Sequence, residues 1–341
     1  MIKTVGIVSL SSGILGEAFV RHELDLGVRR LEAMGLSVRI LPHARKGLEY
    51  VKAHPEDRAA DLLQAFRDPE IDLILCAIGG DDTYRLLPYL FGHGELAEAI
   101  SEKPFLGFSD TTINHFILHK LGLPTFYGQS FLPDVCELEA DMLPYTRRYF
   151  EELITTGTIR RVTPSDVWYA ERTSYGADQV GVARISHPDR GFVLLQGAPV
   201  FSGEILGGCF DSMFEMFDPC RYADMPELCS RYALFPPEAD WRGRILLLET
   251  SEEKMPPEQF RRALELLKAH GVFRAVSGVL FGKPIDGQYE QEYWRALVEV
   301  IDDPTLPIVC NLKVGHALPR CIVPFGVPAV VDTERQEIRF T

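Results

Sequence analysis

Three polar residues of this chain follow buried apolar runs, and their side-chain types could together perform nucleophilic catalysis. Ser109 follows residues 105–108 in FLGFSDTTINHF. Glu249 ends the apolar run in ILLLET, and His316 comes shortly after another apolar run in LKVGHALP. A serine nucleophile needs a base, and the base needs an acceptor that orients it. The chain therefore offers a nucleophile, an acid and a base in the order Ser, Glu, His.

Each of these residues also has a purely structural interpretation. The sequence GFSDT matches the G-x-S-x-G turn of hydrolases only in part, because Thr111 stands where the last glycine would be. Ser-Asp-Thr-Thr is rich in residues that cap helices, so Ser109 could simply cap the next helix. Glu249 could form an ion pair, and His316 could be an ordinary core histidine. From these residues alone, both interpretations remain open.

A glycine-rich turn after residues 72–78 could supply a second requirement of this chemistry, a backbone donor to the oxyanion. Gly79 and Gly80 allow the backbone to approach a ligand closely, and the Gly80 N–H is a candidate donor to an oxyanion. The same GGDD sequence also resembles the phosphate and metal loop of phosphofructokinases. A Mg²⁺-dependent phosphotransferase using Asp81 and Asp82 is therefore an alternative function. Against it, the N-terminal SLSSGILGE lacks the Gly-Gly-Asp turn of those enzymes.

Metal chemistry is not favoured elsewhere in the chain. His115 and His119 are four residues apart in HFILH, which is the spacing of two zinc ligands on one helix face. However, Phe116 stands at the position of the metalloprotease glutamate, and no third ligand is evident. The seven cysteines are scattered without a CxxC pair, which indicates free thiols in a reducing compartment. We expect no metal and no organic cofactor.

The elements that must position these residues alternate along the first half of the chain. We expect strands at 4–10, 37–41, 72–78, 105–108 and 124–127, and helices at 17–33, 55–66, 111–121 and 138–155. Such alternation with continuous apolar strands predicts a parallel sheet covered on both faces. Sites in these sheets lie beyond the carboxyl ends of the strands, where Gly80 and Ser109 both fall.

The second half of the chain differs in composition and in its pattern of predicted elements. Residues 156–190 are polar and are predicted to form a linker with short strands. We then expect strands at 192–195, 244–248, 276–281, 308–312, 329–332 and 338–340, and helices at 210–217, 257–270 and 290–301. The predicted organisation is an N-terminal α/β domain over 1–155, a linker over 156–190, and a C-terminal, β-rich mixed α/β domain over 191–341.

Composition restricts the partners. The chain has 341 residues, is 46% hydrophobic and has a formal net charge of −14. This charge argues against nucleic-acid and membrane-surface binding, both of which need a basic face. No signal peptide and no membrane-spanning run is evident, so we expect a cytoplasmic protein.

The ordered motifs GIVSLSS, AIGGDDTYRLLPYL, FLGFSDTTINHF, FSGEILGGCFDSMFEMF, ILLLETSEEK, VSGVLFGKP and VGHALPRCIVPFG resemble the LD-carboxypeptidase family of serine peptidases. Within this family, the motifs are most similar to those of the microcin-C immunity branch. The resemblance implies a Ser109–Glu249–His316 triad, with the nucleophile in the first domain and the other two residues in the second. It also implies an oxyanion hole from the backbone N–H groups of Gly80 and Asp110, and a homodimer.

The resemblance leaves the substrate open between a murein peptide and an aminoacyl or peptidyl nucleotide. The family often has Asn where GGCF places Cys209, which could alter specificity. Trp168 could stack on a nucleotide base or only pack the linker, and Lys254 could meet a substrate carboxylate or phosphate or remain solvated. A non-catalytic ligand-binding protein is a third functional class, and it predicts that the triad side chains do not meet.

Overall fold

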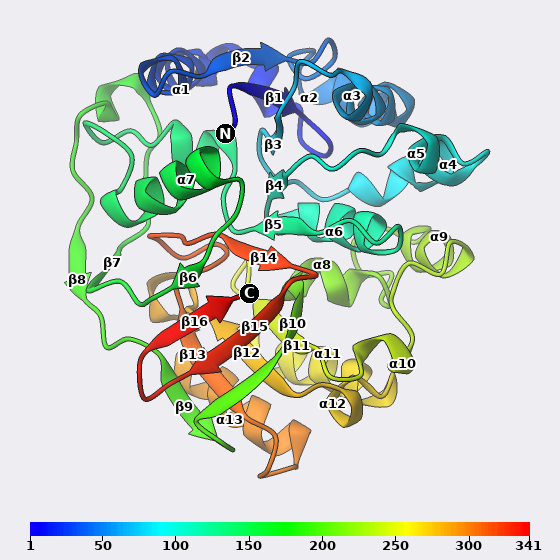
Figure 1. The fold of residues 1–341 in the computed structure, drawn as a ribbon, viewed down its shortest axis with the longest axis vertical. Coiled ribbons are helices and arrows are strands. Elements are labelled where there is room, and N and C mark those ends of the chain that lie inside the picture. The colour runs from blue at the N-terminus through cyan, green and yellow to red at the C-terminus, as the bar shows by residue number, and fades with distance from the viewer.

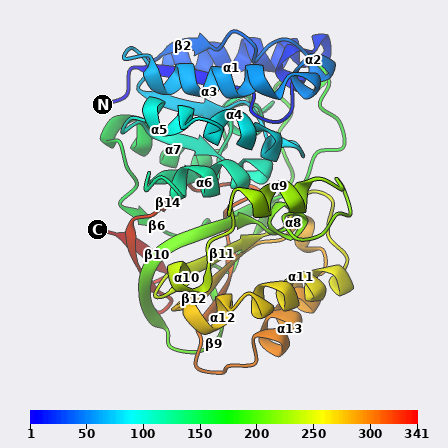
Figure 2. The ribbon, with the colours of Figure 1, turned by 90° about the vertical axis from the view of Figure 1, so that its right-hand side faces the viewer.

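Two sheets, joined along the middle of the molecule, organise the chain. The computed structural model describes residues 1–341. Figure 1 shows the N-terminal sheet in the upper half and the C-terminal sheet in the lower half, and Figure 2 shows both termini at the same side of the molecule. A continuous apolar core extends through both halves. This confirms the predicted fold class, a parallel-sheet α/β half followed by a β-rich mixed half.

The first sheet has six strands in the order β14-β5-β4-β3-β1-β2, where β14 is Val323–Phe325. The five strands other than β14 pair in parallel, and they are β1 (Thr4–Val8), β2 (Ser37–Ile40), β3 (Leu73–Cys76), β4 (Phe105–Gly107) and β5 (Thr125–Tyr127). Most of their residues are buried, as expected for a parallel sheet with helices on both faces. All five correspond to predicted strands.

Helices cover this sheet and connect its strands, as Figure 2 shows for the upper half of the molecule. They are α1 (Arg21–Ala33), α2 (Leu48–Ala53), α3 (Pro55–Arg67), α4 (Leu87–Phe91), α5 (Glu95–Ala99), α6 (Thr112–His119) and α7 (Pro144–Thr156). The helix predicted at 17–33 begins later than expected, because a separate 3-10 turn occupies Ala18–Val20.

The helix predicted from residue 138 begins only at Pro144, and the prediction for 138–143 was wrong. Proline is favoured in the first turn of a helix, where its missing N–H costs nothing. The preceding segment is held in another conformation by Arg30. Its guanidinium donates to the backbone carbonyls of Val135, Glu137 and Glu139 at 2.9, 2.5 and 2.7 Å. These carbonyls are therefore taken up by a side chain.

The second sheet has eight strands in the order β6-β16-β15-β10-β11-β12-β13-β9. They are β6 (Arg161–Val162), β9 (Val193–Gln196), β10 (Val200–Cys209), β11 (Ile245–Glu249), β12 (Gly278–Gly282), β13 (Ile308–Leu312), β15 (Pro328–Asp332) and β16 (Glu337–Phe340). The four central strands, β10 to β13, are parallel, and the outer strands pair antiparallel.

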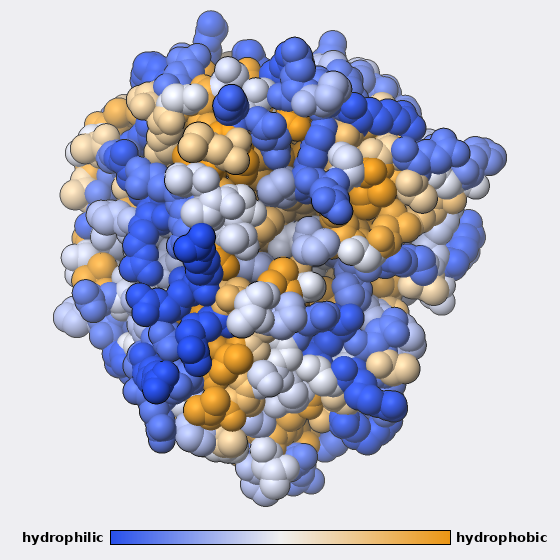
Figure 3. All heavy atoms as spheres, viewed as in Figure 1, coloured by the Kyte–Doolittle hydropathy of each residue, from blue (hydrophilic) through white to orange (hydrophobic).

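The remaining elements surround this sheet. The helices are α8 (Phe210–Glu215), α9 (Met225–Arg231), α10 (Glu238–Trp241), α11 (Pro257–Ala269), α12 (Val272–Ala275) and α13 (Glu290–Ile301). A separate hairpin in the predicted linker consists of β7 (Val167–Tyr169) and β8 (Ser186–Pro188). No helix is long and apolar enough to cross a membrane. The face drawn in Figure 3 is largely hydrophilic, with separate apolar patches.

Strand β10 is the longest strand of the chain and was not predicted. Its sequence VFSGEILGGC has three glycines, which usually weaken a strand. The structure explains all three. A Cβ on Gly203 would lie 2.3 Å from the Gly243 carbonyl oxygen. A Cβ on Gly207 would lie 1.9 Å from the Leu247 carbonyl oxygen, and one on Gly208 would lie 2.5 Å from Thr112 Oγ1. The glycines therefore permit close contact with β11 on one side and with α6 of the first half on the other.

Strand β14 (Val323–Phe325) joins the two halves. It belongs to the C-terminal part of the sequence, yet it pairs antiparallel with β5 at the edge of the first sheet. In Figure 1 it lies between the halves, next to β5. The residues predicted as the C-terminal domain thus contribute a strand to the N-terminal sheet. This arrangement fixes the carboxyl end of β5 against the second half of the chain.

The buried β11 strand gives a test of this architecture. Leu247 is 0% exposed at the centre of the second sheet. We expect Leu247→Ala to lower the free energy of unfolding by about 2–5 kcal/mol, because it leaves a cavity in the core. Urea denaturation measures the change. Val298→Ala on α13, at a side chain that is 38% exposed, should change stability by less than about 0.5 kcal/mol. Equal effects would contradict the assigned core.

Candidate active site

Ser109 lies on a strained turn between β4 and α6. Its φ angle is 66°, in the left-handed region that non-glycine residues rarely adopt. The turn continues as the 3-10 segment Ser109–Thr111, and no side chain caps it or the helix α6 that follows. The Ser109 hydroxyl instead lies 2.9 Å from His316 Nε2. Strain of this kind collects at functional sites, where it aims a side chain.

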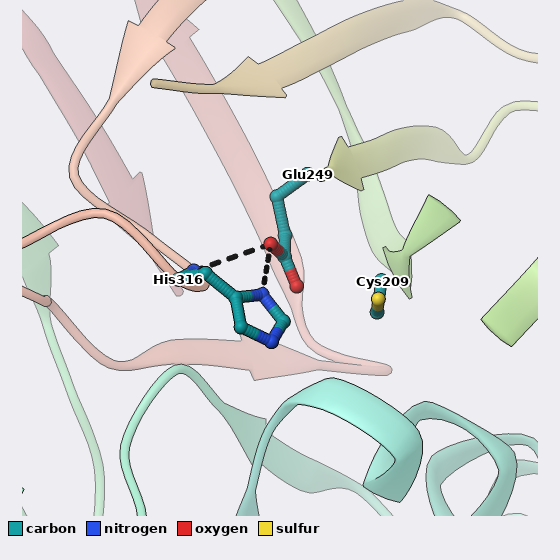
Figure 4. A group of neighbouring side chains, drawn as sticks. All are labelled: Cys209, Glu249 and His316. Carbon is teal, nitrogen blue, oxygen red and sulfur yellow. Dashed lines mark hydrogen bonds and ion pairs between the residues drawn. The ribbon is translucent and has the colours of Figure 1, made fainter. Parts of the chain in front are cut away.

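Glu249 and His316 meet beneath this serine. Glu249 is the last residue of β11 and is 1% exposed. Its Oε2 accepts hydrogen bonds from His316 Nδ1 at 2.7 Å and from the His316 backbone N–H at 3.2 Å, as drawn in Figure 4. The two contacts fix both the ring and its backbone. The three residues that the sequence singled out as nucleophile, acid and base thus lie together, with the imidazole between the other two.

Gly315 makes room for this contact. Its φ angle is 82°, and a Cβ there would lie 2.2 Å from Glu249 Cδ. A side chain at this position would therefore collide with the carboxylate. Glycine allows the loop after β13 to turn across the end of β11 and to present His316.

The charge of Glu249 controls the protonation of His316. Burial by itself would lower the pKa of the imidazole. The neighbouring Glu249 charge and its hydrogen bond outweigh burial, with a smaller contribution from Glu252, so the pKa of His316 is raised above its usual value. The Glu252 carboxylate is largely exposed and lies 3.1 Å from His316 Nε2. An imidazole in this setting is a stronger base than one in water.

The glycine turn after β3 lies against Ser109. A Cβ on Gly79 would be 2.6 Å from Ser109 Cβ and 2.7 Å from Oγ, and one on Gly80 would be 2.3 Å from Ser11 Oγ. The Gly80 N–H donates to no acceptor of the protein. A free N–H beside a nucleophile is suited to receive the oxygen of a reacting carbonyl.

Asp110 turns its side chain into the protein. Asp110 Oδ2 accepts hydrogen bonds from Ser11 Oγ at 2.6 Å and from the Thr83 N–H at 2.9 Å. Burial raises the pKa of this carboxyl group to about 6. Through Oδ2 the side chain therefore holds the two neighbouring loops, whereas its buried Oδ1 has no hydrogen-bond partner.

Tyr127 belongs to the site, although no sequence pattern singled it out. It ends β5, is fully buried, and donates from its hydroxyl to Glu249 Oε1 at 2.6 Å. The same hydroxyl accepts the Ser109 N–H at 3.3 Å. A tyrosine at the end of an apolar strand also fits ordinary strand packing. Its place at a carboxyl end, next to Gly128, was the only available signal.

Two cavities open on Ser109. The first has a volume of about 480 Å³, and few of its lining residues are hydrophobic; its wall includes Cys209, Asp211, Glu215 and Arg221. The second, of about 330 Å³, is lined in part by Ile78, Phe108, Tyr175, His316 and Arg320. Gly80 and Glu252 also line both. A substrate with groups on each side of a scissile bond could therefore extend in two directions from the serine.

The three residues suggested as substrate contacts are placed differently. Cys209 is buried in the wall of the larger cavity, and its N–H donates to Thr112 Oγ1 at 2.8 Å. Trp168 lines neither cavity; its ring stacks on His187 at 4.3 Å, with Lys283 Nζ at 4.9 Å. Lys254 also lines neither, and its Nζ lies 3.5 Å from Asp286. Only Cys209 is thus in the cleft of this structure.

The alternative metal sites are not assembled. Asp82 is buried and forms an ion pair of 2.6 Å with Arg58, and Asp81 accepts from Tyr222. His115 is buried and uses both ring nitrogens, toward Thr125 and a backbone carbonyl. These groups are therefore already satisfied by the protein.

One group of metal-binding residue types does come together, namely Cys209, Glu249 and His316, whose ligand atoms lie within 4.8 Å of one another (Figure 4). Its carboxylate oxygens are both occupied, by His316 and by Tyr127. In this group, Glu249 is therefore hydrogen-bonded both to His316 and to Tyr127.

The arrangement is that of a serine hydrolase, with a hydroxyl, an imidazole and a carboxylate in sequence. Family comparison agrees. The LD-carboxypeptidase N-terminal domain matches residues 5–128, and the LD-carboxypeptidase C-terminal domain matches residues 202–331. The chain therefore belongs to the LD-carboxypeptidase family of serine peptidases, which confirms the resemblance seen in its motifs.

Curated relatives extend over most of the chain. A probable murein peptide carboxypeptidase of Bacillus subtilis is 26% identical over 91% of this chain and 84% of its own length. The microcin C7 self-immunity protein MccF of Escherichia coli is 25% identical over 99% of this chain and 93% of its own length.

A solved structure is much more similar. The crystal structure of an MccF-like protein from Streptococcus pneumoniae in complex with AMP has 58% sequence identity and a TM-score of 0.99. It covers 100% of this chain and 99% of that one. Wild-type microcin C7 self-immunity protein without ligand has a TM-score of 0.80 at 23% identity, which shows the shared fold.

The contact between Gly79 and Ser109 gives a test of the site. In Gly79→Ala the new methyl group would displace the Ser109 side chain, and we expect labelling of Ser109 by a fluorophosphonate to slow by about 10²-fold. Gly122→Ala is the control, because nothing lies within 4 Å of its Cβ position, although Gly122 has a positive φ that Gly79 does not share. That variant should be labelled at the wild-type rate. Equal rates in all three proteins would refute the assigned contact.

Proposed function

We propose that this protein hydrolyses an amide bond through an acyl-enzyme, with Ser109 as nucleophile, His316 as base and Glu249 as acid. The observation that supports it most directly is the continuous hydrogen-bonded series from Ser109 Oγ to His316 Nε2 and from His316 Nδ1 to Glu249, at 2.9 and 2.7 Å. A non-catalytic binding protein would have no need for this alignment.

In the proposed reaction, His316 takes the proton of Ser109 as the hydroxyl oxygen attacks the scissile carbonyl. Glu249 holds the imidazole in the required tautomer and stabilises the imidazolium that forms. The N–H groups of Gly80 and Asp110 bind the developing oxyanion, and each such donor can lower the barrier by about 2.7–4 kcal/mol. His316 then protonates the leaving amine, and water releases the acyl group by the reverse sequence.

We propose that the substrate carries an aminoacyl or peptidyl group joined to a nucleotide-like moiety. The support is similarity over the whole chain, at 58% identity, to an MccF-like protein that was crystallised with AMP. The microcin C7 self-immunity protein has been solved with aspartyl sulfamoyl adenosine. Removing such groups would detoxify an antibiotic of that class. Cavities on both sides of Ser109 fit a substrate with two substantial parts.

Hydrolysis of a murein peptide at an L–D bond is the second candidate, supported by the murein peptide carboxypeptidase relative from Bacillus subtilis. Such a substrate ends in a free carboxylate, which needs a cation. In the larger cavity Arg221 already contacts Glu215, Glu253 and Asp81. The same cavity also contains Lys52, whose Nζ donates to the Tyr222 hydroxyl. Because a nucleotide phosphate needs a cation as much as a carboxylate does, charge does not separate the two candidates, and the preference for the nucleotide-linked substrate rests on the similarity to the protein crystallised with AMP. A homodimer is also proposed, from the family resemblance alone.

Ser109→Ala tests the chemistry. Without the hydroxyl no acyl-enzyme can form, and we expect kcat to fall by about 10³-fold or more on any true substrate. Aspartyl sulfamoyl adenosine and a murein tetrapeptide should be compared by following product release, with and without a chelator. Ser230→Ala on α9 is the control, since Ser230 is exposed. Full activity in Ser109→Ala would overturn the serine mechanism, and loss of wild-type activity with chelator would favour metal chemistry.

The raised pKa of His316 predicts the pH dependence. Hydrolysis needs the neutral imidazole, so kcat/KM should fall as the pH drops through a value above about 6.5, the usual histidine pKa. The Glu249→Gln substitution removes the charge that raises the pKa of His316. That acid limb should therefore move to lower pH, while kcat falls by about 10⁴-fold. Exposed Glu265 gives the control Glu265→Gln. An acid limb unchanged by Glu249→Gln would contradict the assignment.

A further inference from the structure

Tyr127 lies at the junction of the two halves, beside the nucleophile and the acid. It ends β5, and its ring stacks on Phe325 of β14, with the ring centres 5.2 Å apart and an angle of 10° between the planes. The side chain is 0% exposed. A buried phenol needs a partner for its hydroxyl, and here several partners converge on it.

The hydroxyl of Tyr127 has a defined direction. It donates to Glu249 Oε1 at 2.6 Å and accepts from the Ser109 N–H at 3.3 Å and from Thr112 Oγ1 at 3.5 Å. Thr112 Oγ1 in turn accepts the Cys209 N–H at 2.8 Å. Each donor therefore points along one path from β10, through α6 and β5, to the carboxylate. Hydrogen bonds aligned in this way strengthen one another.

For Glu249, Tyr127 is the partner of the carboxylate oxygen that His316 does not use. Oε2 holds the ring and backbone of His316, whereas Tyr127 supplies the side-chain hydrogen bond to Oε1. Burial, together with the Glu249 charge, raises the pKa of Tyr127 well above its usual value, so the phenol keeps its proton and remains a donor. Loss of this donor would leave a buried charged oxygen unpaired.

For Ser109, the same hydroxyl holds the backbone of the strained turn. The Ser109 N–H donates to this hydroxyl. The residue has a φ of 66°, a conformation that persists only where the surroundings enforce it. One oxygen atom thus contacts both the main chain of the nucleophile and the side chain of the acid. These two groups come from different sheets, and His316 has to fit between them.

We propose that Tyr127 is a positioning residue of the triad, which sets the distance between Ser109 and Glu249 and tunes the basicity of His316 through Glu249. This inference rests on the proposed function. Tyr127 touches no reacting atom and acts through its two partners. With its hydroxyl removed, the negative charge of Glu249 is less neutralised and holds the His316 proton more strongly.

Tyr127→Phe tests the proposal, because phenylalanine keeps the ring on Phe325. We expect kcat/KM to fall by about 10- to 100-fold with little change in KM, and its acid limb to move to higher pH. Tyr293→Phe is the matched control: Tyr293 is 1% exposed, and its hydroxyl donates to the Met255 carbonyl, outside the site. That variant should keep the wild-type acid limb, so a general loss of buried hydrogen bonding would not imitate the expected shift.

The outcomes separate this inference from the proposed function. If Ser109→Ala remains active, the proposed function fails, whatever Tyr127→Phe does. If the wild-type protein hydrolyses its substrate through Ser109, but Tyr127→Phe retains both its kcat/KM and its acid limb, the positioning role is refuted.

If Tyr127→Phe does not fold, Thr112→Val decides the question, since it removes the hydroxyl that donates to Tyr127. A smaller shift of the acid limb in the same direction supports the proposal, and Thr112→Ser should restore the wild-type limb. A wild-type limb in Thr112→Val would overturn it.

Discussion

The structure of the site depends on burying one carboxylate, that of Glu249, at the junction of two sheets. A charge that is 1% exposed is tolerated only if the protein replaces the hydrogen bonds of water. His316 supplies two donors, from its ring and its backbone, and Tyr127 supplies a third. These donors come from segments on opposite sides of the junction. The carboxylate can therefore be satisfied only when both halves are in place, and its satisfaction orients the base.

The architecture brings strand ends to this point. The turns after β3 and β4 carry Gly80 and Ser109, while β11 ends at Glu249 and the loop after β13 holds His316. Parallel strands present their carboxyl ends at one edge, so each sheet gathers its own polar residues there. Strand β14 then pairs with β5, which fixes one edge against the other. Glycines at the closest approaches, such as Gly315 against Glu249, allow the backbones to meet.

Much of this was predictable from residue types at strand ends. A polar residue at the end of an apolar run is easy to recognise in a sequence as a candidate site residue. This is the position of Ser109, Glu249 and His316. Tyr127 was not predictable in the same way, because a tyrosine that closes a strand is also normal packing. The strand β10 was missed since its glycines serve contacts made by distant segments. The start of α7 was misplaced because Arg30, more than a hundred residues away, binds the carbonyls before it. Long-range contacts decided each of these cases.

The departure at position 209 can be understood on the same terms. Where the resemblance to the family led us to expect Asn, this chain has Cys209, whose backbone N–H donates to Thr112 and so joins the series that leads through Tyr127 to Glu249. Any residue type can make that backbone contact, so the frame of the site does not depend on the side chain. The thiol instead forms part of the wall of the larger cavity, beside Asp211. Burial raises the pKa of the thiol well above its usual value, with the Glu249 charge adding to the effect, and it therefore remains a neutral group. The side chain at this position, which lines the cavity, is thus separate from the backbone contact that leads through Thr112 and Tyr127 to Glu249.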